Sequence, residues 1–351
     1  MFNPEKFRTK IFSSSINFEE AALKLFRFQA EHVEIYKQYI SLLKIEPFKI
    51  NSINEIPFLP ISFFKTHKII SDQLFGIGTE EKIASFLAMT ESGKPETIFT
   101  SSGTTGSATS KHYVADIRWY EESFTKGFKH FYGNIDEYCI LALLPSYLER
   151  TGSSLVYMTD YLIRKSNHLD SGFYLNEMNV LIEKIKSLQE QKQKTILLGV
   201  TYALLDLAEQ INFSSINNNW EFIIMETGGM KGKRKEMIRE EVHEILCHAF
   251  DVKTIHSEYG MTELLSQAYS KGNGIFQTPP WMQILIRDIN DSKNIIANNQ
   301  TGGINIIDLA NVYSCAFIAT QDLGRKYNDN SFEVLGRFDD SDLRGCNLMV
   351  Q

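Results

Sequence analysis

The middle of this 351-residue chain alternates strand-like runs with stretches of helical periodicity, and this alternation constrains its fold more than any other feature. The strand-like runs are 139–145, 195–200, 221–226 and 252–260. Short, mostly apolar runs are typical of strands buried on both faces. Helical patterns lie between them, over Phe173–Gln189, from about Thr201, and over Lys231–His248. Strands that alternate with helices predict a mainly parallel sheet covered on both faces.

The two ends of the chain have different patterns. Apolar residues of Asn17–Leu43 recur at nearly helical spacing, which predicts one or two N-terminal helices. Residues 56–69 contain Pro57 and Pro60, and the residue before a proline avoids the helical conformation, so we expect an extended segment. From Trp281 onward, strand-like runs follow without long helices between them. The chain is therefore predicted to be α/β, with a smaller antiparallel β subdomain.

Composition and charge exclude several classes of protein. The chain has 36 basic and 43 acidic residues, a net charge of −7, which disfavours a general nucleic-acid binder. We see no secretory leader and no run of about 20 apolar residues, so we expect no membrane span. The four cysteines form no CxxC pair for zinc or dithiol chemistry, and they indicate a reducing cytoplasm. Cys139, Cys247 and Cys315 have apolar neighbours and are expected in the core.

The strongest local motif is the loop at residues 100–110, TSSGTTGSATS. Its hydroxyls, glycines and backbone N–H groups are suited to wrap a phosphate chain. It is neither a Walker A loop, because no GKS or GKT follows, nor a GxGxxG dinucleotide fingerprint. Taken by itself, the same composition also fits a flexible polar loop.

A second cluster, HSEYGMTE at 256–263, stands where the fourth strand ends. Ligands of α/β sheets bind at the carboxyl ends of strands. Tyr259 offers a flat face for a purine, Thr262 a hydroxyl for a phosphate, and Glu263 a hard oxygen for Mg²⁺. Residues 226–229, ETGG, close the third strand with little side-chain bulk. Asp322 and Arg337 further along are suited to ribose hydroxyls and phosphate.

In this order, TSSGTTG, TGGM, SEYGMTE, QDLGR and GRFDD resemble the motifs of the adenylate-forming ligase superfamily, which couples a carboxylic acid to AMP. IPFLPISFFKTHKI at 56–69 and LRGCNLM at 343–349 resemble the acyl-protein synthetase family. That family is the fatty-acid-activating component of bacterial long-chain fatty-acid reductase systems. The resemblance implies a superfamily core of parallel sheets and a smaller β subdomain, with ATP and Mg²⁺ as cofactors.

The resemblance also implies roles for individual residues. Thr262 would contact the α-phosphate and Glu263 would bind Mg²⁺, so both are candidate catalytic residues. Gly228 and Gly229 would lie beside the adenine and Tyr259 would stack on it. The full set of candidate ATP-binding residues is Ser101, Ser102, Gly103, Thr104, Thr105, Gly106, Gly228, Gly229, Tyr259, Gly260, Asp322 and Arg337.

Two departures from the superfamily pattern concern positive charge. The loop of related ligases ends in a lysine, and here that position is Thr109. The usual ligases also continue into a small mobile lid domain with a catalytic lysine, and we expect this chain to lack that lid. Lys111, Lys231 and Lys233 are open alternatives for the missing cation, and each also fits plain surface charge.

Cys346 is the candidate nucleophile. It stands beside Arg344, and a nearby cation lowers the pKa of a thiol and raises its thiolate fraction. The resemblance implies that the acyl group rests on this cysteine as a thioester and then passes to a partner reductase. We accordingly divide the chain into an adenylate-forming core, 1–336, and a short tail, 337–351.

Three functions stay open at this point. The first is an acyl-protein synthetase that activates a carboxylic, fatty acid and transfers it to a protein thiol. The second is a ligase that passes its adenylate to coenzyme A or another small acceptor. The third is an inactive binding homologue. Expected partners are the acid and an acyl-accepting reductase or carrier, with no nucleic acid and no membrane span.

Overall fold

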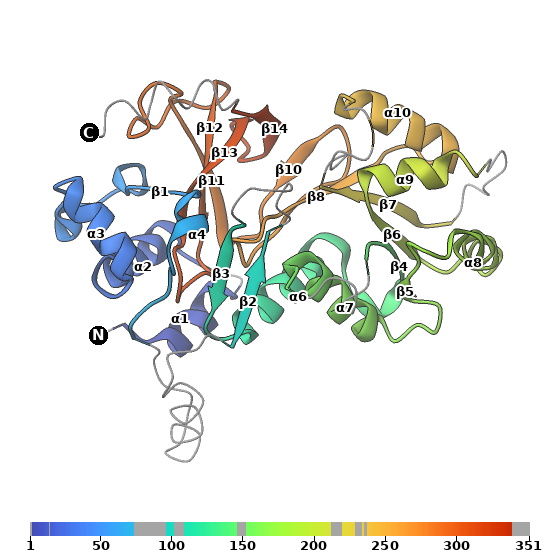
Figure 1. Cartoon of the computed structure of the whole chain (residues 1–351), viewed down its shortest axis with the longest axis horizontal. Helices are drawn as coiled ribbons and strands as arrows, with labels where there is room; N and C mark the ends of the chain where they lie inside the picture. The colour runs from blue at the N-terminus through green and yellow to red at the C-terminus, as the bar shows by residue number, and fades with distance from the viewer. Residues whose placement is uncertain are drawn as a thin grey trace, which may run out of the picture. The chain divides into compact units, whose positions relative to one another are not determined.

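The computed structural model of the protein describes residues 2–13, 15–73, 96–101, 109–145, 152–211, 220–228, 234 and 237–338. The chain forms two compact units (Figure 1). Unit 1 comprises Met1–Ser123, Met261–Ser266 and Thr278–Gln351, and unit 2 comprises Phe124–Gly260 and Gln267–Gln277. Unit 2 carries the strands of the predicted parallel sheet. Unit 1 carries the N-terminal helices and the predicted β subdomain.

Five parallel strands form the centre of unit 2, in the order β8, β7, β6, β4, β5. They are β4 (Cys139–Leu143), β5 (Gly172–Phe173), β6 (Thr195–Val200), β7 (Phe222–Thr227) and β8 (His256–Tyr259). The short strands β9 (Ala268–Ser270) and β10 (Ile275–Gln277) add to β8 in antiparallel pairing. Every residue of β4 and β6 is buried, as continuous apolar runs require. The predicted parallel sheet is confirmed.

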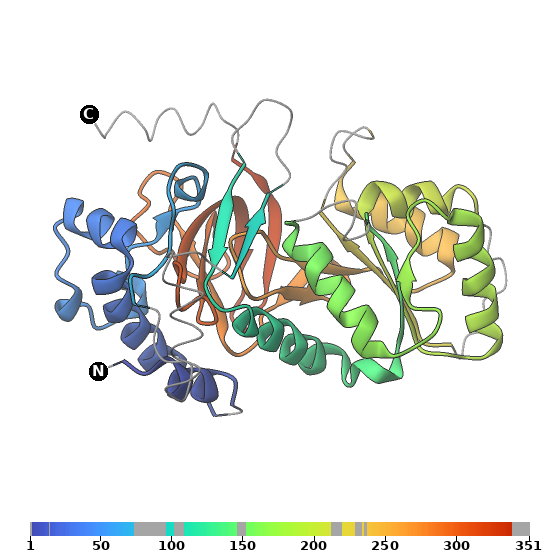
Figure 2. The same cartoon turned by 60° about the horizontal axis from the view of Figure 1, so that its bottom comes forward.

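Helices cover both faces of these parallel strands. They are α7 (Ser154–Ser166), α8 (Met178–Glu190), α9 (Thr201–Ala208) and α10 (Arg239–Phe250). Figure 2 shows α7 on one face of the strands and α9 and α10 on the other. The helix predicted to start at Phe173 begins instead at Met178, because Gly172 and Phe173 pair with β4 as the short strand β5.

Unit 1 contains the predicted antiparallel β subdomain, which is confirmed. Its strands β11 (Met282–Arg287), β12 (Thr301–Asp308), β13 (Phe317–Lys326) and β14 (Phe332–Arg337) pair in chain order. The short strand β1 (Leu59–Pro60) lies parallel to β13, with Leu59 opposite Ile318. A separate hairpin joins β2 (Thr97–Thr100) to β3 (Lys111–Val114), so the loop at 101–110 connects two paired strands.

The N-terminal helices of unit 1 are α1 (Pro4–Ile11), α2 (Phe18–His32) and α3 (Glu34–Leu42). The prediction of one or two helices over Asn17–Leu43 is confirmed, since α2 and α3 lie there, and the side chain of Asn17 caps α2. One-turn elements complete the set: α4 (Phe63–Thr66), η1 (Pro47–Lys49), η2 (Ile53–Glu55) and η3 (Ile135–Glu137). Helix α6 (Arg118–Tyr132) begins in unit 1 and ends in unit 2.

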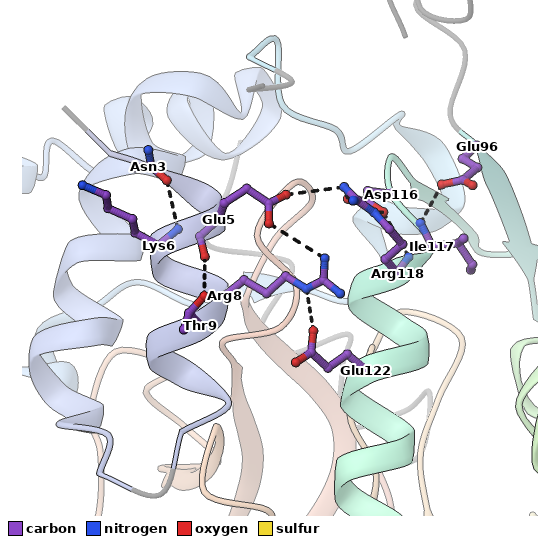
Figure 3. A network of polar contacts seen from close by, with 10 residues as sticks. All are labelled: Asn3, Glu5, Lys6, Arg8, Thr9, Glu96, Asp116, Ile117, Arg118 and Glu122. Atoms are coloured by element: carbon purple, nitrogen blue, oxygen red, sulfur yellow. Dashed lines mark hydrogen bonds and ion pairs between the residues drawn. The ribbon is translucent and has the colours of Figure 1, made fainter. Parts of the chain in front are cut away.

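A polar network joins α1 to the start of α6 within unit 1 (Figure 3). The Nε group of Arg8 donates to a carboxylate oxygen of Glu122 at 2.6 Å. Glu5 lies 3.4 Å from a guanidinium nitrogen of Arg118, which also pairs with Asp116. These contacts fix the start of α6, and with it the strand β3 that precedes this helix.

The described residues contain no helix that combines the length and the apolar character needed to cross a bilayer. The apolar core of unit 1 centres on Phe317 of β13, which is fully buried. Its ring packs against Phe26, Tyr36 and Phe58, with centroids 5.9 to 6.3 Å away. Strand β13 is therefore the element on which the N-terminal helices and β1 are assembled.

Candidate functional site

The ends of the loop at 100–110 are tied together at the base of the β2–β3 hairpin. The backbone N–H of Ser101 donates to the carbonyl of Ser110 at 3.1 Å, and the hydroxyl of Ser101 accepts from the N–H of Ser110 at 2.9 Å. The tip of the loop, Ser102 to Gly106, lies outside the described residues, and so do Gly229, Lys231, Lys233 and Cys346. Their predicted roles stay predictions.

His112, two residues after the loop, reaches the second predicted cluster. Its Nδ1 atom lies 2.9 Å from the backbone carbonyl of Thr262. Its Nε2 atom lies 3.1 Å from Oδ1 of Asn311. The amide of Asn311 in turn donates to the carbonyl of Glu263 at 2.9 Å. Burial lowers the pKa of His112 to about 4, against the effect of its two hydrogen bonds.

Asp308, at the end of β12, anchors the same segment from its other side. One carboxylate oxygen accepts from the backbone N–H groups of Leu265 and Ser266, at 2.7 and 3.0 Å. The other accepts from the Ser266 hydroxyl. Burial raises the pKa of Asp308, and these hydrogen bonds oppose the rise. His112 and Asn311 thus fix the first half of the segment Met261–Ser266, and Asp308 fixes its second half.

Glu263 lies in this segment with its side chain only 4% exposed. Burial raises the pKa of its carboxyl group. A hydrogen bond from Ser110 and the positive charges of Arg337 and Lys65 act in the opposite direction. The base of the first motif, through Ser110, therefore contacts the proposed metal ligand of the second. The end of the loop and the segment Met261–Ser266 thus lie together in unit 1.

Asp322 and Arg337, both predicted for the ribose, form an ion pair. Asp322 on β13 and Arg337 on β14 are opposite each other in the strand register. The Nε group of Arg337 donates to Oδ1 of Asp322 at 3.0 Å. The carboxylate is nearly buried, whereas the guanidinium side chain is 80% exposed. A fixed carboxylate beside an accessible cation can receive both a hydroxyl group and a phosphate.

The remaining predicted residues belong to unit 2. Gly228 follows β7 with a φ of 71°, a conformation that glycine adopts readily. Tyr259 ends β8, where the ring lies 5.9 Å from that of Phe276. A side chain on Gly260 would approach the carboxylate of Glu258 so closely that this carboxylate would have to shift. Glu258 accepts a hydrogen bond from the Thr227 hydroxyl at 2.5 Å, which joins the ends of β7 and β8.

The described cysteines fit their predicted structural roles in part. Cys139 and Cys315 are buried, and burial raises the pKa of each thiol to about 12. Cys247 is half-buried, and burial raises its pKa as well. Such thiols are poor nucleophiles, because the thiolate is the reactive form.

Sequence reasoning did not single out Asp308, Asn311 or Lys65 as site residues, and it named Ser110 only as the last residue of the loop motif. Asp308 lies in GINIIDL, a stretch that had been interpreted as strand only, and Asn311 follows it two residues later. Lys65 lies in IPFLPISFFKTHKI, the segment that pointed to the narrower family, and that resemblance was the available signal.

Several solved structures are similar to this chain. An open conformation of 2-hydroxyisobutyryl-CoA ligase, in complex with 2-HIB-AMP and CoA, has a TM-score of 0.63 at 13% identity, covering 92% of this chain and 69% of that one. The same ligase in the postadenylation state has a TM-score of 0.58 at 12% identity, and the match covers 92% of this chain and 67% of that one. ATP-bound MatB from Rhodopseudomonas palustris has a TM-score of 0.48 at 16% identity, and the match covers 68% of this chain and 47% of that one. This chain thus spans less than half the length of MatB.

The likeness to 2-hydroxyisobutyryl-CoA ligase defines the class of fold, and the predicted core of the adenylate-forming ligases is confirmed. No curated protein sequence matches the chain. The model of the family described as "Acyl-protein synthetase, LuxE" matches residues 10–351, and the chain belongs to this family. The family inferred from the motifs is confirmed.

Proposed function

We propose that this chain uses ATP to activate a carboxylic acid, of the fatty-acid class, as an acyl-adenylate. One observation carries the proposal: Ser110 and His112, at the base of the loop, contact Glu263 and Thr262. Residues 150 positions apart therefore bring hydroxyl groups, backbone N–H groups and a carboxylate to one place in unit 1. This combination is suited to phosphate and magnesium.

Glu263 fits the role of a magnesium ligand. Its carboxylate is buried, which is costly unless a positive group neutralises it. Within the described ranges, no group of three or more His, Cys, Asp or Glu side chains could hold a metal ion. Magnesium needs no such group, since it takes one or two carboxylates together with phosphate oxygens and water. Bound there, Mg²⁺ would neutralise phosphate charge.

The chain's own groups would position the reactants. Thr262 would donate its hydroxyl to the α-phosphate, and Asp322 with Arg337 would hold the ribose. A carboxylate oxygen of the acid then bonds to the α-phosphorus while the bond to the leaving pyrophosphate breaks. Little covalent work falls on the protein, so orientation and charge stabilisation provide most of the catalysis.

In the second step, the thiolate of Cys346 in the tail 337–351 attacks the acyl carbonyl and releases AMP, leaving a thioester. A reducing cytoplasm would keep this thiol available. The acyl group would then pass to an acyl-accepting reductase or carrier, as the family membership suggests. The buried Cys139 and Cys315, with their raised pKa values, are unsuited to this step.

Exchange of labelled pyrophosphate into ATP tests the first step. A panel of carboxylic acids of increasing chain length should include acids that support exchange, and omission of Mg²⁺ should abolish it. Absence of exchange with every acid, by a folded protein, would favour an inactive binding homologue and refute the proposal.

Retention of labelled acid on denatured protein tests the second step. Cys346→Ser should abolish acylation that neutral hydroxylamine releases, and should leave pyrophosphate exchange intact. Cys247→Ser is the matched control and should acylate normally. Acylation of the Cys346→Ser variant would contradict the thiol assignment, and efficient formation of acyl-coenzyme A would favour the alternative acceptor.

A further inference from the structure

Lys65 occupies a position next to the phosphate-binding part of the proposed site. The N–H of Ile61 donates to the carbonyl of Ala319 on β13 at 2.9 Å, so the segment that leads into α4 is fixed to that strand. Asp322, the ribose candidate, lies three residues further along β13. The turn of helix α4 that contains Lys65 therefore begins beside the strand that carries part of the site.

The neighbouring Phe64 fixes α4 from the other side. Its side chain is buried, and its ring meets the ring of His112 edge to face, with centroids 5.8 Å apart. Figure 1 shows α4 beside β3, the strand that contains His112. Because His112 is bonded to Thr262, the packing of Phe64 places helix α4, which contains Lys65, close to the segment of Thr262 and Glu263.

Lys65 has the exposure that a ligand-binding cation needs. Its side chain is exposed, and its charge acts on the carboxyl group of Glu263 together with that of Arg337. Among the residues that the structure describes, Lys65 forms no ion pair within 4.0 Å. The ammonium group of Lys65 is therefore available to a phosphate oxygen.

Lys111 is a weaker choice for the same role. In β3, burial alternates along the strand, with Lys111 exposed and His112 buried. Successive side chains of a strand point to opposite faces. Since His112 points toward Thr262, the side chain of Lys111 leaves the hairpin on the other face.

We propose that Lys65 is a catalytic residue of the adenylation step, supplying a cation to the phosphate groups of ATP. This inference rests on the proposed function. Its ammonium group would donate to a non-bridging phosphate oxygen and stabilise the charge that grows as the bond between the α-phosphorus and pyrophosphate breaks. A new bond from the carboxylate oxygen to the same phosphorus balances the step, and Lys65 remains protonated throughout.

The test compares pyrophosphate exchange by Lys65→Ala, Lys65→Gln and Lys65→Arg with wild type, using MgATP and the acid that works best for wild type. Removal of one transition-state donor typically costs about 10²-fold in rate, so we expect exchange to fall by about 10²-fold in Ala and Gln variants. Lys65→Arg should keep a tenth or more of the wild-type rate. The melting temperature should not move, and the Kd for ATP should change much less than the rate.

Lys68→Ala is the matched control, because Lys68 is exposed on the same segment but its ammonium lies 5.6 Å over the ring of Tyr113. It should exchange at nearly the wild-type rate. Exchange by Lys65→Ala within twofold of wild type would overturn the inference and leave the proposed function standing. So would a large loss in Lys111→Ala with none in Lys65→Ala. A wild-type chain that shows no exchange overturns both.

Discussion

The ring of His112 holds the backbone carbonyl of Thr262 at 2.9 Å across 150 residues of sequence. This bond joins the strand that follows the Ser/Thr/Gly loop to the segment that carries the proposed magnesium ligand. His112 lies in β3, two residues after the loop, and contacts the second motif. A single buried side chain thus joins the strand after the loop to the segment that carries the proposed magnesium ligand.

Removal of this side chain should destabilise unit 1. His112→Ala leaves the carbonyl of Thr262 and Oδ1 of Asn311 without their partner and opens a cavity, so we expect a loss of about 2–4 kcal/mol in the free energy of unfolding. Chemical denaturation measures it. His130→Ala, at an exposed position of α6, should change stability by less than about 0.5 kcal/mol. Equal effects of the two changes would contradict the buried role.

Asp308 should be as important as His112 for the same segment. Asp308→Ala removes the acceptor of two buried backbone N–H groups, those of Leu265 and Ser266, which should cost about 3 kcal/mol or more. Asp308→Asn keeps an oxygen in place and should cost less. Asp291→Ala, at an exposed turn, serves as the control in denaturation. A stable Asp308→Ala variant with full exchange activity would show that the segment does not need this anchor.

His256 on β8 should give the protein a distinct acid sensitivity. Burial, and then the charge of Lys271, lower its pKa to about 4, from about 6.5 in the unfolded chain. Because the unfolded state binds the proton more tightly, the stability contributed at higher pH is lost as pH falls from 6.5 toward 4. The slope for one group is at most about 1.4 kcal/mol per pH unit. Denaturation at several pH values should show a shallower slope for His256→Gln than for wild type, and an identical slope would contradict this.

The strands could be predicted from the sequence because a short, continuous apolar run is by itself typical of a buried strand. Runs 139–145 and 195–200 became β4 and β6 almost to the residue. The start of α8 could not be predicted, because Phe173 continues the apolar pattern of the helix while its backbone pairs with Ala142 of β4. Periodicity does not report such a pairing between distant segments.

The supporting residues of the site were beyond sequence reasoning for the same reason. Asn311 reads as a polar residue after a strand, yet its amide reaches Glu263, 48 residues earlier. Lys65 reads as one of many surface lysines until Phe64 is found against His112. By contrast, the roles of Glu263 and Thr262 could be predicted from their own chemistry and from the motif that contains them.

The described cysteines should differ sharply in reactivity from Cys346. Cys139 and Cys315 are buried with pKa values raised to about 12, so iodoacetamide should not modify them in the native protein at neutral pH. Cys247, half-buried, should react slowly. Peptide mapping after native and denatured labelling distinguishes the sites. If the acyl group is found on Cys139 or Cys315 after turnover, the relay through the tail is wrong.

Glu263→Gln should separate activity from stability. The folded-state pKa of Glu263 lies above its unfolded value because of burial, so its charge destabilises the protein at neutral pH. That penalty disappears as pH falls through the folded-state pKa, and an uncharged glutamine avoids it throughout. We expect the variant to unfold at an equal or higher temperature than wild type in the absence of Mg²⁺ and nucleotide. Its pyrophosphate exchange should nevertheless fall by about 10²-fold or more, because a carboxylate ligand of Mg²⁺ is lost.

The magnesium dependence makes the Glu263 prediction specific. MgATP should raise the melting temperature of wild type and raise that of Glu263→Gln much less, since ligand binding stabilises only the state that binds it. Glu333→Gln, on β14 of the same unit, removes a carboxylate from an ion pair with Arg325 and is the matched control. It should respond to MgATP as wild type does. A Glu263→Gln variant that is less stable than wild type and keeps its exchange activity would assign the buried carboxylate to the fold and remove it from the metal site.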